Sequence, residues 1–333
     1  MAQTPTAPAR RHSAWIRWGR LAVSIALLAL LVTKVDPDEL VPPNRSLAGS
    51  LFFLCTGLLF MAISFVVASW RWQRVLAVYD AHVPIRTLLK HYLAGQFVGN
   101  ALPSTVGGDV LRISRCSKDT GSTEVAFASV VIERLTGFVA LPLLIFVGFA
   151  ARPDLLSLGR SWLAIAIAVA TLVVLGMIVV LSASPRLAGR FVHRANWTRY
   201  IGILHVGIDR MRRDPRDASA ALFAAVVYQL TVLAAVYCAV HTIGLTIPNG
   251  AVLAFIPAVA MVQVLPISVG GLGVREGMMV LLLHPLGVPT GQAVAVGLLW
   301  FAMTLIVSLA GAPAFAIGHK EHHQPAPARA EAS

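Results

Sequence analysis

Several ionisable residues fall inside apolar stretches of this chain, where a charge is costly and therefore points to function. Arginine guanidinium groups bind phosphate through forked, bidentate hydrogen bonds, so such arginines suit an anionic head group. Carboxylates beside them can balance the positive charge of an empty site, contact an amine head group, or act as a general base. The residues concerned are Asp109, Arg112, Glu133, Arg134, Arg275 and Glu276.

Most of these residues lie in or beside two copies of one motif. The first copy covers residues 100–112 and the second covers 263–275, and the two align without a gap. Each combines a proline, a glycine pair and an arginine in one register, which predicts a helix break followed by a tight turn. Backbone N–H groups around the glycines can add to an anion-binding concavity. Together with Glu133 and Arg134, the expected substrate-binding residues are Asn100, Ser104, Gly107, Gly108, Asp109, Arg112, Ser268, Gly270, Gly271, Arg275 and Glu276.

The same residues also allow purely structural interpretations. Glu133 and Arg134 can lock helices together, although adjacent residues point to different faces of a helix and must find separate partners. Asp109 and Arg112, three residues apart, can cap and pair at the start of a helix. Glycines are also common where membrane helices pack closely. A packing role and a binding role therefore remain alternatives at this level.

The composition is that of an all-α polytopic membrane protein. Hydrophobic residues make up 57% of the 333-residue chain and charged residues only 13%, with a mean hydropathy of +0.76. Soluble domains carry about 25% charged residues. The apolar runs are long enough to cross a hydrocarbon core about 30 Å thick. We expect about six full spans, near 15–35, 47–70, 124–150, 162–182, 218–243 and 291–317.

The two motif regions, 86–122 and 251–286, are expected to form re-entrant hairpins, with full spans as the alternative. An odd number of spans separates them, so the hairpins should enter from opposite faces of the membrane. This parity predicts inverted repeat halves, about 15–150 and 161–317, within a single transmembrane domain of residues 15–317. Inverted repeats with broken helices near the midplane recur in transporters. Residues 1–14 and 318–333 are expected to be disordered cytoplasmic tails.

The net charge of +12 comes mainly from arginines between the apolar runs. This pattern indicates positive-inside loops that face anionic lipid, and it argues against nucleic acid as a partner. The most basic segment, the loop 184–217, is expected to carry a helix that lies on the cytoplasmic leaflet. Residues 70–74 are interpreted as an aromatic and cationic interface anchor. The apolar face expected for the loop helix consists of Ile201, Leu204, Ile208 and Met211.

Enzyme signals are weak. The chain contains no GxSxG, HExxH, Walker A or dinucleotide-binding fingerprint. Its three cysteines are scattered, and neither a cofactor nor a metal ion is expected. The residues therefore favour a transporter over an enzyme.

At these motifs the sequence resembles the transmembrane region of lysylphosphatidylglycerol synthases, a flippase-like integral membrane family. The resemblance covers about residues 15–317, and this chain is similar to a stand-alone member without the synthase domain. In fused members this region resembles a flippase for aminoacylated phosphatidylglycerol, while stand-alone relatives are associated with glycolipid, polyprenyl-phosphate or hopanoid pathways. The matching residues are Arg71-Trp72, Gly95, Asn100, Leu102-Pro103, Gly107-Gly108-Asp109, Arg112, Glu133-Arg134, Gly137, Pro266, Ser268, Gly270-Gly271, Gly273 and Arg275-Glu276.

The resulting expectation is a lipid flippase of the bacterial inner membrane, with both termini cytoplasmic and membrane lipids as its partners. The first alternative is a membrane-embedded enzyme that acts on a lipid head group. The second is an accessory protein that organises lipid-biosynthesis enzymes through the loop 184–217. The substrate, the direction, the energy source and the oligomeric state are left open by the sequence.

Overall fold

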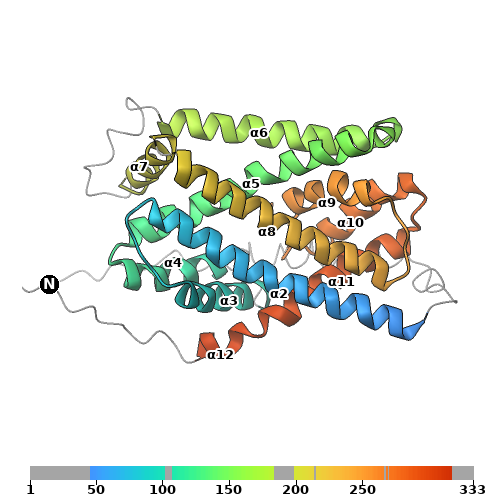
Figure 1. The fold of residues 1–333 in the computed structure, drawn as a ribbon, viewed down its shortest axis with the longest axis horizontal. Coiled ribbons are helices and arrows are strands. Elements are labelled where there is room, and N and C mark those ends of the chain that lie inside the picture. The colour runs from blue at the N-terminus through green and yellow to red at the C-terminus, as the bar shows by residue number, and fades with distance from the viewer. Residues whose placement is uncertain are drawn as a thin grey trace, which may run out of the picture.

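The computed structural model describes residues 46–101, 107–183, 199–213, 215–265, 268 and 270–316. These residues form α-helices and two short 3-10 helices and contain no strand, as the composition predicts (Figure 1). The 3-10 helices are Pro153–Ser157 and His284–Leu286. The α-helices are α2 Leu47–Ala77, α3 Ile85–Ala101, α4 Gly107–Thr120, α5 Thr123–Ala151, α6 Ser161–Ala183, α7 Arg199–Arg213, α8 Pro215–Thr242, α9 Asn249–Gln263, α10 Val274–Leu283, α11 Thr290–Ser308 and α12 Gly311–Ala316.

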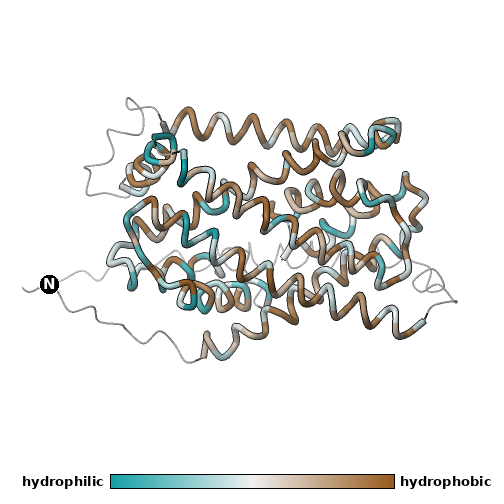
Figure 2. The backbone as a smooth tube through the Cα atoms, viewed as in Figure 1, coloured by the Kyte–Doolittle hydropathy of each residue, from teal (hydrophilic) through white to brown (hydrophobic). Residues whose placement is uncertain are grey.

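Five of the described helices are long and apolar enough to cross a membrane, namely α2, α5, α6, α8 and α11. They correspond to the expected spans from 47–70 onward, and the span expected at 15–35 lies outside the described residues. Helix α6 packs on α5 and α9, yet most of its surface is apolar and exposed, as hydrocarbon-facing helices require (Figure 2). The chain is therefore a multi-pass membrane protein.

Both motif regions form the expected helical hairpins. Helices α3 and α4 pack on each other, and so do α9 and α10. With 17, 14, 15 and 10 residues, these helices are at most about 25 Å long at 1.5 Å per residue, shorter than the hydrocarbon core. Gly270, Gly271 and Gly273 have positive φ angles, which only glycine adopts freely, and they make the turn that starts α10.

The two hairpins enter the bundle from opposite ends (Figure 1). The α3–α4 hairpin lies at the end that carries α7, whereas the α9–α10 hairpin lies at the other end. The three long helices α5, α6 and α8 run between them in the chain, so the parity argument holds for the described part of the molecule. A two-fold relation between complete halves stays a prediction.

Small residues bring the helices that position the site into close contact. Helices α2 and α8 pack along each other, and Gly57 allows close approach to Cys238 and Ala235. A side chain at Gly108 would collide with the backbone of Gly95, so this glycine pair sets the spacing of the first hairpin. Close approach of backbones is how membrane helices gain packing energy.

The span expected at 291–317 is too long, because the structure breaks it in two. Helix α11 ends at Ser308, and α12 follows as a separate short helix that packs on α3. Arg115 of α4 donates to the carbonyl oxygens of Ala314 (2.9 Å) and Phe315 (3.4 Å). These bonds satisfy carbonyls that the end of a helix leaves open. The last part of the expected span is therefore attached to the first hairpin.

The expected loop helix exists, and its apolar face is covered by protein. In α7 the apolar residues Leu204, Ile208 and Met211 pack against the bundle, in a cluster with Val75 and Ile132. Burial against protein removes this face from water as effectively as lipid would. Figure 1 shows α7 against the ends of α5 and α8. The side chain of Ile201 lies outside the described residues.

Candidate functional site: a cationic cavity between the hairpins

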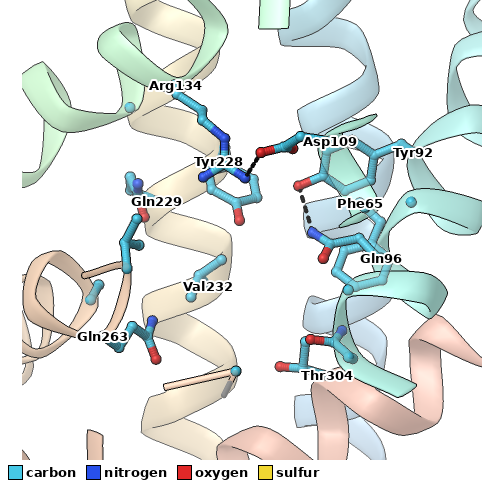
Figure 3. A pocket seen from close by; sticks show the side chains of 18 of the residues that line it. Phe65, Tyr92, Gln96, Asp109, Arg134, Tyr228, Gln229, Val232, Gln263 and Thr304 are labelled. Carbon is cyan, nitrogen blue, oxygen red and sulfur yellow. Dashed lines mark hydrogen bonds and ion pairs between the residues drawn. The ribbon is translucent and has the colours of Figure 1, made fainter. Parts of the chain in front are cut away.

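A cavity of about 300 Å³ lies between the two hairpins. Its walls come from α2, α3, α4, α5, α8, α9, α10 and α11, and they combine charged, amide and aromatic side chains. In Figure 3, Gln229 and Gln263 lie on one side of this space and Gln96 and Thr304 on the other. A polar cavity inside an apolar bundle is costly to maintain, which makes it the leading candidate for a binding site.

Glu133 is the centre of the charged network. It lies on α5 and is only 1% exposed. One carboxylate oxygen accepts from Nη2 of Arg71 on α2, and the other accepts from Nη2 of Arg112 on α4 at 3.0 Å. Both arginines are 5% exposed. A carboxylate this deep needs such partners, because an unpaired buried charge costs several kcal/mol.

The interpretation of residues 70–74 as a surface anchor is wrong at its centre. Arg71 points into the bundle, and Trp72 is fully buried and donates through Nε1 to Oγ of Ser129 at 3.0 Å. The buried residues of α2 recur every three or four positions from Met61 to Val75, and both residues fall on that stripe. This helical spacing was a signal in the sequence that the aromatic and cationic composition obscured.

Arg112 is held between aromatic rings. Its guanidinium carbon lies 4.3 Å from the ring centre of Trp72 and 4.7 Å from that of Tyr92. Stacking of this kind stabilises a guanidinium without consuming its N–H donors. Its Nη1 also lies 3.5 Å from Oδ1 of Asp109, one turn earlier on α4. Arg112 is therefore fixed in orientation at the cavity wall.

Arg134 and Asp109 form a second ion pair across the cavity (Figure 3). The pair joins α5 to α4, and the side chain of Arg134 is 41% exposed, unlike those of the other two arginines. Glu133 and Arg134 thus take different partners, as their adjacent positions predict. Because its partner Asp109 is shared with Arg112, Arg134 is the cation that can most readily exchange that partner for another anion.

The second hairpin contributes one cation to the same cavity. Arg275 donates through Nε (3.0 Å) and Nη2 (2.7 Å) to Oε1 of Glu276, and Oε2 of Glu276 accepts from the N–H of Gly273 at 2.6 Å. Arg275 lines the cavity, whereas Glu276 is completely buried beside Gly297. Glu276 therefore caps the start of α10 and neutralises the charge of Arg275 within the second hairpin.

The structure brings Asp109 and Arg112 of the first hairpin and Arg275 of the second to one cavity, but no ion pair joins the two hairpins among the described residues. In the described part of the chain, the cited ion pairs of the first hairpin lie within α4 or join it to α5, and that of the second hairpin lies within α10. Glu276, an expected substrate-binding residue, does not line the cavity, because its side chain is completely buried beside Gly297. Two cationic walls thus face one polar space from opposite hairpins.

The buried polar side-chain atoms that line the cavity without a hydrogen-bond partner are all donors among the described residues. Within the described part of the chain, the buried lining nitrogens without a partner are Nε and Nη1 of Arg71, Nε of Arg112, Nε of Arg134 and Nδ2 of Asn100. All of them are donors. In the network of the first hairpin, three guanidinium groups face the two carboxylates of Asp109 and Glu133. The cavity is therefore suited to a ligand that is anionic and rich in acceptor oxygens.

A family comparison agrees with this architecture. The model of the lysylphosphatidylglycerol synthase TM region matches residues 17–311. The chain belongs to this family. No curated protein matches the chain. Membership of the lysylphosphatidylglycerol synthase TM region family places the protein in a membrane family connected with lipid metabolism and transport.

In this family member, the remaining expected site residues divide into lining and supporting positions. Asn100, Gly108 and Gly270 line the cavity. Gly107 starts α4 and Gly271 lies in the turn before α10, so their role is in the backbone. The last two are Ser268, which is completely buried, and Ser104, which lies outside the described residues.

Sequence reasoning missed several residues of the site. Arg71 is the most important, and the others are neutral polar residues that complete the lining. A glutamine within an apolar helix, such as Gln229 in α8 or Gln263 at the end of α9, is itself a signal, because its amide needs a partner in lipid. The neutral lining residues missed in this way are Tyr92, Gln96, Tyr228, Gln229, Gln263 and Thr304.

Proposed function

We propose that this protein is a lipid flippase, which moves the head group of a phospholipid or lipid-linked compound across the inner membrane. The observation that carries the proposal is the donor-rich, cationic cavity between hairpins that enter from opposite ends. The head group would pass through this cavity while the acyl chains stay in the bilayer. Sites at the meeting point of broken helices are reachable from either side when the hairpins rock in turn.

In this proposal the arginines contact the head-group phosphate. Arg112 is a fixed donor. Arg134 exchanges Asp109 for the phosphate, and Arg275, on the second hairpin, binds the phosphate from the opposite wall of the cavity. Asp109 and Glu133 balance these charges in the empty cavity, and Glu276 does so for Arg275. Guanidinium groups suit this task because they stay charged and form paired hydrogen bonds to phosphate oxygens.

An enzyme that acts on a lipid head group has less support. A general base must lie within hydrogen-bond reach of the proton that it takes, and a carboxylate held in ion pairs is not free to move to its substrate. Both oxygens of Glu133 accept from guanidinium groups, and Asp109 is engaged by Arg112 and Arg134. We therefore favour transport over catalysis, with membrane lipids as the partners.

The orientation follows from the basic residues. Positive charge collects in cytoplasmic loops, and the loop 184–217 is the most basic of the chain. We therefore place the α7 end of the bundle, and both termini, in the cytoplasm of a bacterial cell with the protein in its inner membrane. Lipid-biosynthesis enzymes that meet this loop would be the accessory partners.

The experiment is lipid translocation by the purified protein in liposomes. A fluorescent phosphatidylglycerol is incorporated in both leaflets, and dithionite then bleaches only the label that reaches the outer leaflet. We expect bleaching beyond half of the signal with the wild type, and bleaching of only half with empty liposomes. Arg112→Ala and Arg275→Ala should slow the excess bleaching by about tenfold or more, the value of one charged hydrogen bond.

A matched control is Gly176→Ala in α6, where an added methyl group would meet nothing within 4 Å among the described residues. It should flip at the wild-type rate. No translocation by the wild type would refute the transport proposal. Unchanged translocation in both arginine variants would refute the assignment of these residues.

A further inference from the structure

The guanidinium group of Arg71 is only partly used by its ion pair. Its Nη2 donates to Glu133, whereas Nε and Nη1 are buried and have no hydrogen-bond partner among the described residues. The face of the group rests on the ring of Tyr228, whose centre lies 4.6 Å from the guanidinium carbon. One face of the guanidinium group and its Nη2 are thus occupied, while Nε and Nη1 have no hydrogen-bond partner among the described residues. Leaving such donors unpaired in a dry interior is costly.

The space in front of these donors depends on Gly137. This glycine lies on α5, one turn after Glu133, and it lines the cavity. A Cβ atom there would lie 3.0 Å from Nη1 of Arg71 and 3.8 Å from Nε2 of Gln229 on α8. Because Gly137 has no side chain, no side-chain atom of this residue crowds the spot between a donor of α2 and a donor of α8.

The charge of the surroundings decides what that group is. Arg71, Arg112 and Arg134 outnumber the carboxylates of Glu133 and Asp109, so the described network carries one excess positive charge. Water would satisfy the donors but leave the charge unbalanced. An oxyanion satisfies both, because charge-assisted hydrogen bonds are the stronger kind. A phosphate group has the oxygen atoms that several donors require.

We propose that Arg71 and Gln229, with the room left by Gly137, form a binding site for a phosphate oxyanion in the buried part of the cavity. That the phosphate belongs to a lipid head group rests on the proposed function. Arg71 is then a substrate-specificity residue: it selects lipids with an anionic phosphate over neutral lipids of the same shape. Glu133 keeps the guanidinium aimed at this place when the lipid has left.

Equilibrium binding to the purified full-length protein in detergent tests this site without transport. The probes for isothermal titration are dioctanoyl phosphatidic acid, dioctanoylglycerol and inorganic phosphate. The first two differ only in the phosphate, and the third separates a lipid source from free phosphate. We expect the wild type to bind phosphatidic acid, with no measurable heat for dioctanoylglycerol and far weaker binding of inorganic phosphate.

Two variants locate the site by different means. Arg71→Gln should weaken binding of dioctanoyl phosphatidic acid about ten- to hundredfold, the range for a hydrogen bond to a charged group. Gly137→Ala keeps every charge and favours the helix, yet its methyl group should displace the ligand and weaken binding about tenfold. Gly176→Ala is the matched control and should bind as the wild type does. Size-exclusion chromatography checks that each variant is folded.

Wild-type affinity in Gly137→Ala and in a folded Arg71→Gln would overturn the site. Equal binding of dioctanoylglycerol would overturn its selectivity, and binding of inorganic phosphate alone would overturn the lipid source. The two proposals can fail separately. If the variants lose binding but the wild type does not translocate lipid, the site is supported and the flippase is refuted. If the wild type translocates lipid but the variants bind as it does, the flippase is supported and the site is refuted.

Discussion

Replacing Glu133 by glutamine tests the charge network most directly. The side chain keeps its size, but the carboxylate that joins Arg71 and Arg112 is lost, and an amide N–H₂ group then faces a guanidinium donor. Removing one partner of a buried ion pair costs about 3–5 kcal/mol. Here two guanidinium groups lose their partner, although Arg112 retains Asp109 at 3.5 Å and aromatic rings on both sides. We therefore expect a loss of about 3–5 kcal/mol, a large part of a typical stability of about 5–15 kcal/mol.

Thermal unfolding of the purified protein, followed through tryptophan fluorescence, measures this loss. The control is Asp154→Asn, which breaks the exposed pair with Arg152 and should leave the midpoint unchanged. A double-mutant cycle adds Arg71→Gln. Because the double variant leaves one fewer unpaired buried charge, it should cost clearly less than the sum of the single variants. A loss below about 1 kcal/mol for Glu133→Gln, or strict additivity, would refute the account of Glu133 as the centre of the network.

Three further changes test the packing around the site. Gly297→Val should destabilise the protein by about 1–3 kcal/mol, because its Cβ would lie 3.1 Å from Cγ of Glu276; the thermal midpoint measures the loss. Trp72→Phe should cost about 0.5–1.5 kcal/mol by the same measurement, since it removes the hydrogen bond to Ser129. Arg115→Ala should release α12 from the first hairpin, and hydrogen exchange should rise in α12 while α6 stays unchanged.

The outcomes that would contradict these expectations are distinct. The control for Gly297→Val is Gly277→Ala on α10, where an added methyl group meets nothing within 4 Å in the described structure. Equal midpoints for the two would show that Glu276 is not confined. A Trp72→Phe variant as stable as the wild type would remove the energetic role of the indole N–H. Unchanged exchange in α12 of Arg115→Ala would mean that other contacts hold this helix.

The long apolar helices and the two hairpins could be predicted because their signals are local. Hydropathy over about 20 residues marks a span, and the proline and glycine pair of each motif marks a break wherever the chain goes afterwards. The same local logic failed at the C-terminal span. There the sequence stays apolar beyond Ser308, yet the chain breaks and α12 turns to α3, where Arg115 supplies donors. A break that depends on a distant partner leaves little trace in hydropathy.

The amphipathic helix α7 shows a second limit. Its apolar face was predictable from spacing, and α7 does carry Leu204, Ile208 and Met211 on one side. Periodicity states that a face must leave water, but it does not state whether lipid or protein covers it. The packing of that face on Val75 and Ile132 follows from the positions of α2 and α5. Whether protein or lipid covers the apolar face of α7 is therefore decided only when the helices pack together.

By itself the sequence determined an all-helical membrane protein and two helical hairpins that enter from opposite ends. It also determined the set of intramembrane charges on which a site can be built. These follow from the cost of placing polar groups in lipid, which each residue carries wherever it lies. The tertiary structure decided which charges meet. Arg71 reaches Glu133 across 62 positions of sequence, whereas Glu276 stays with its neighbour Arg275. Partner choice depends on how the helices pack, so the open donors of Arg71, and the site they indicate, appear only in the folded molecule.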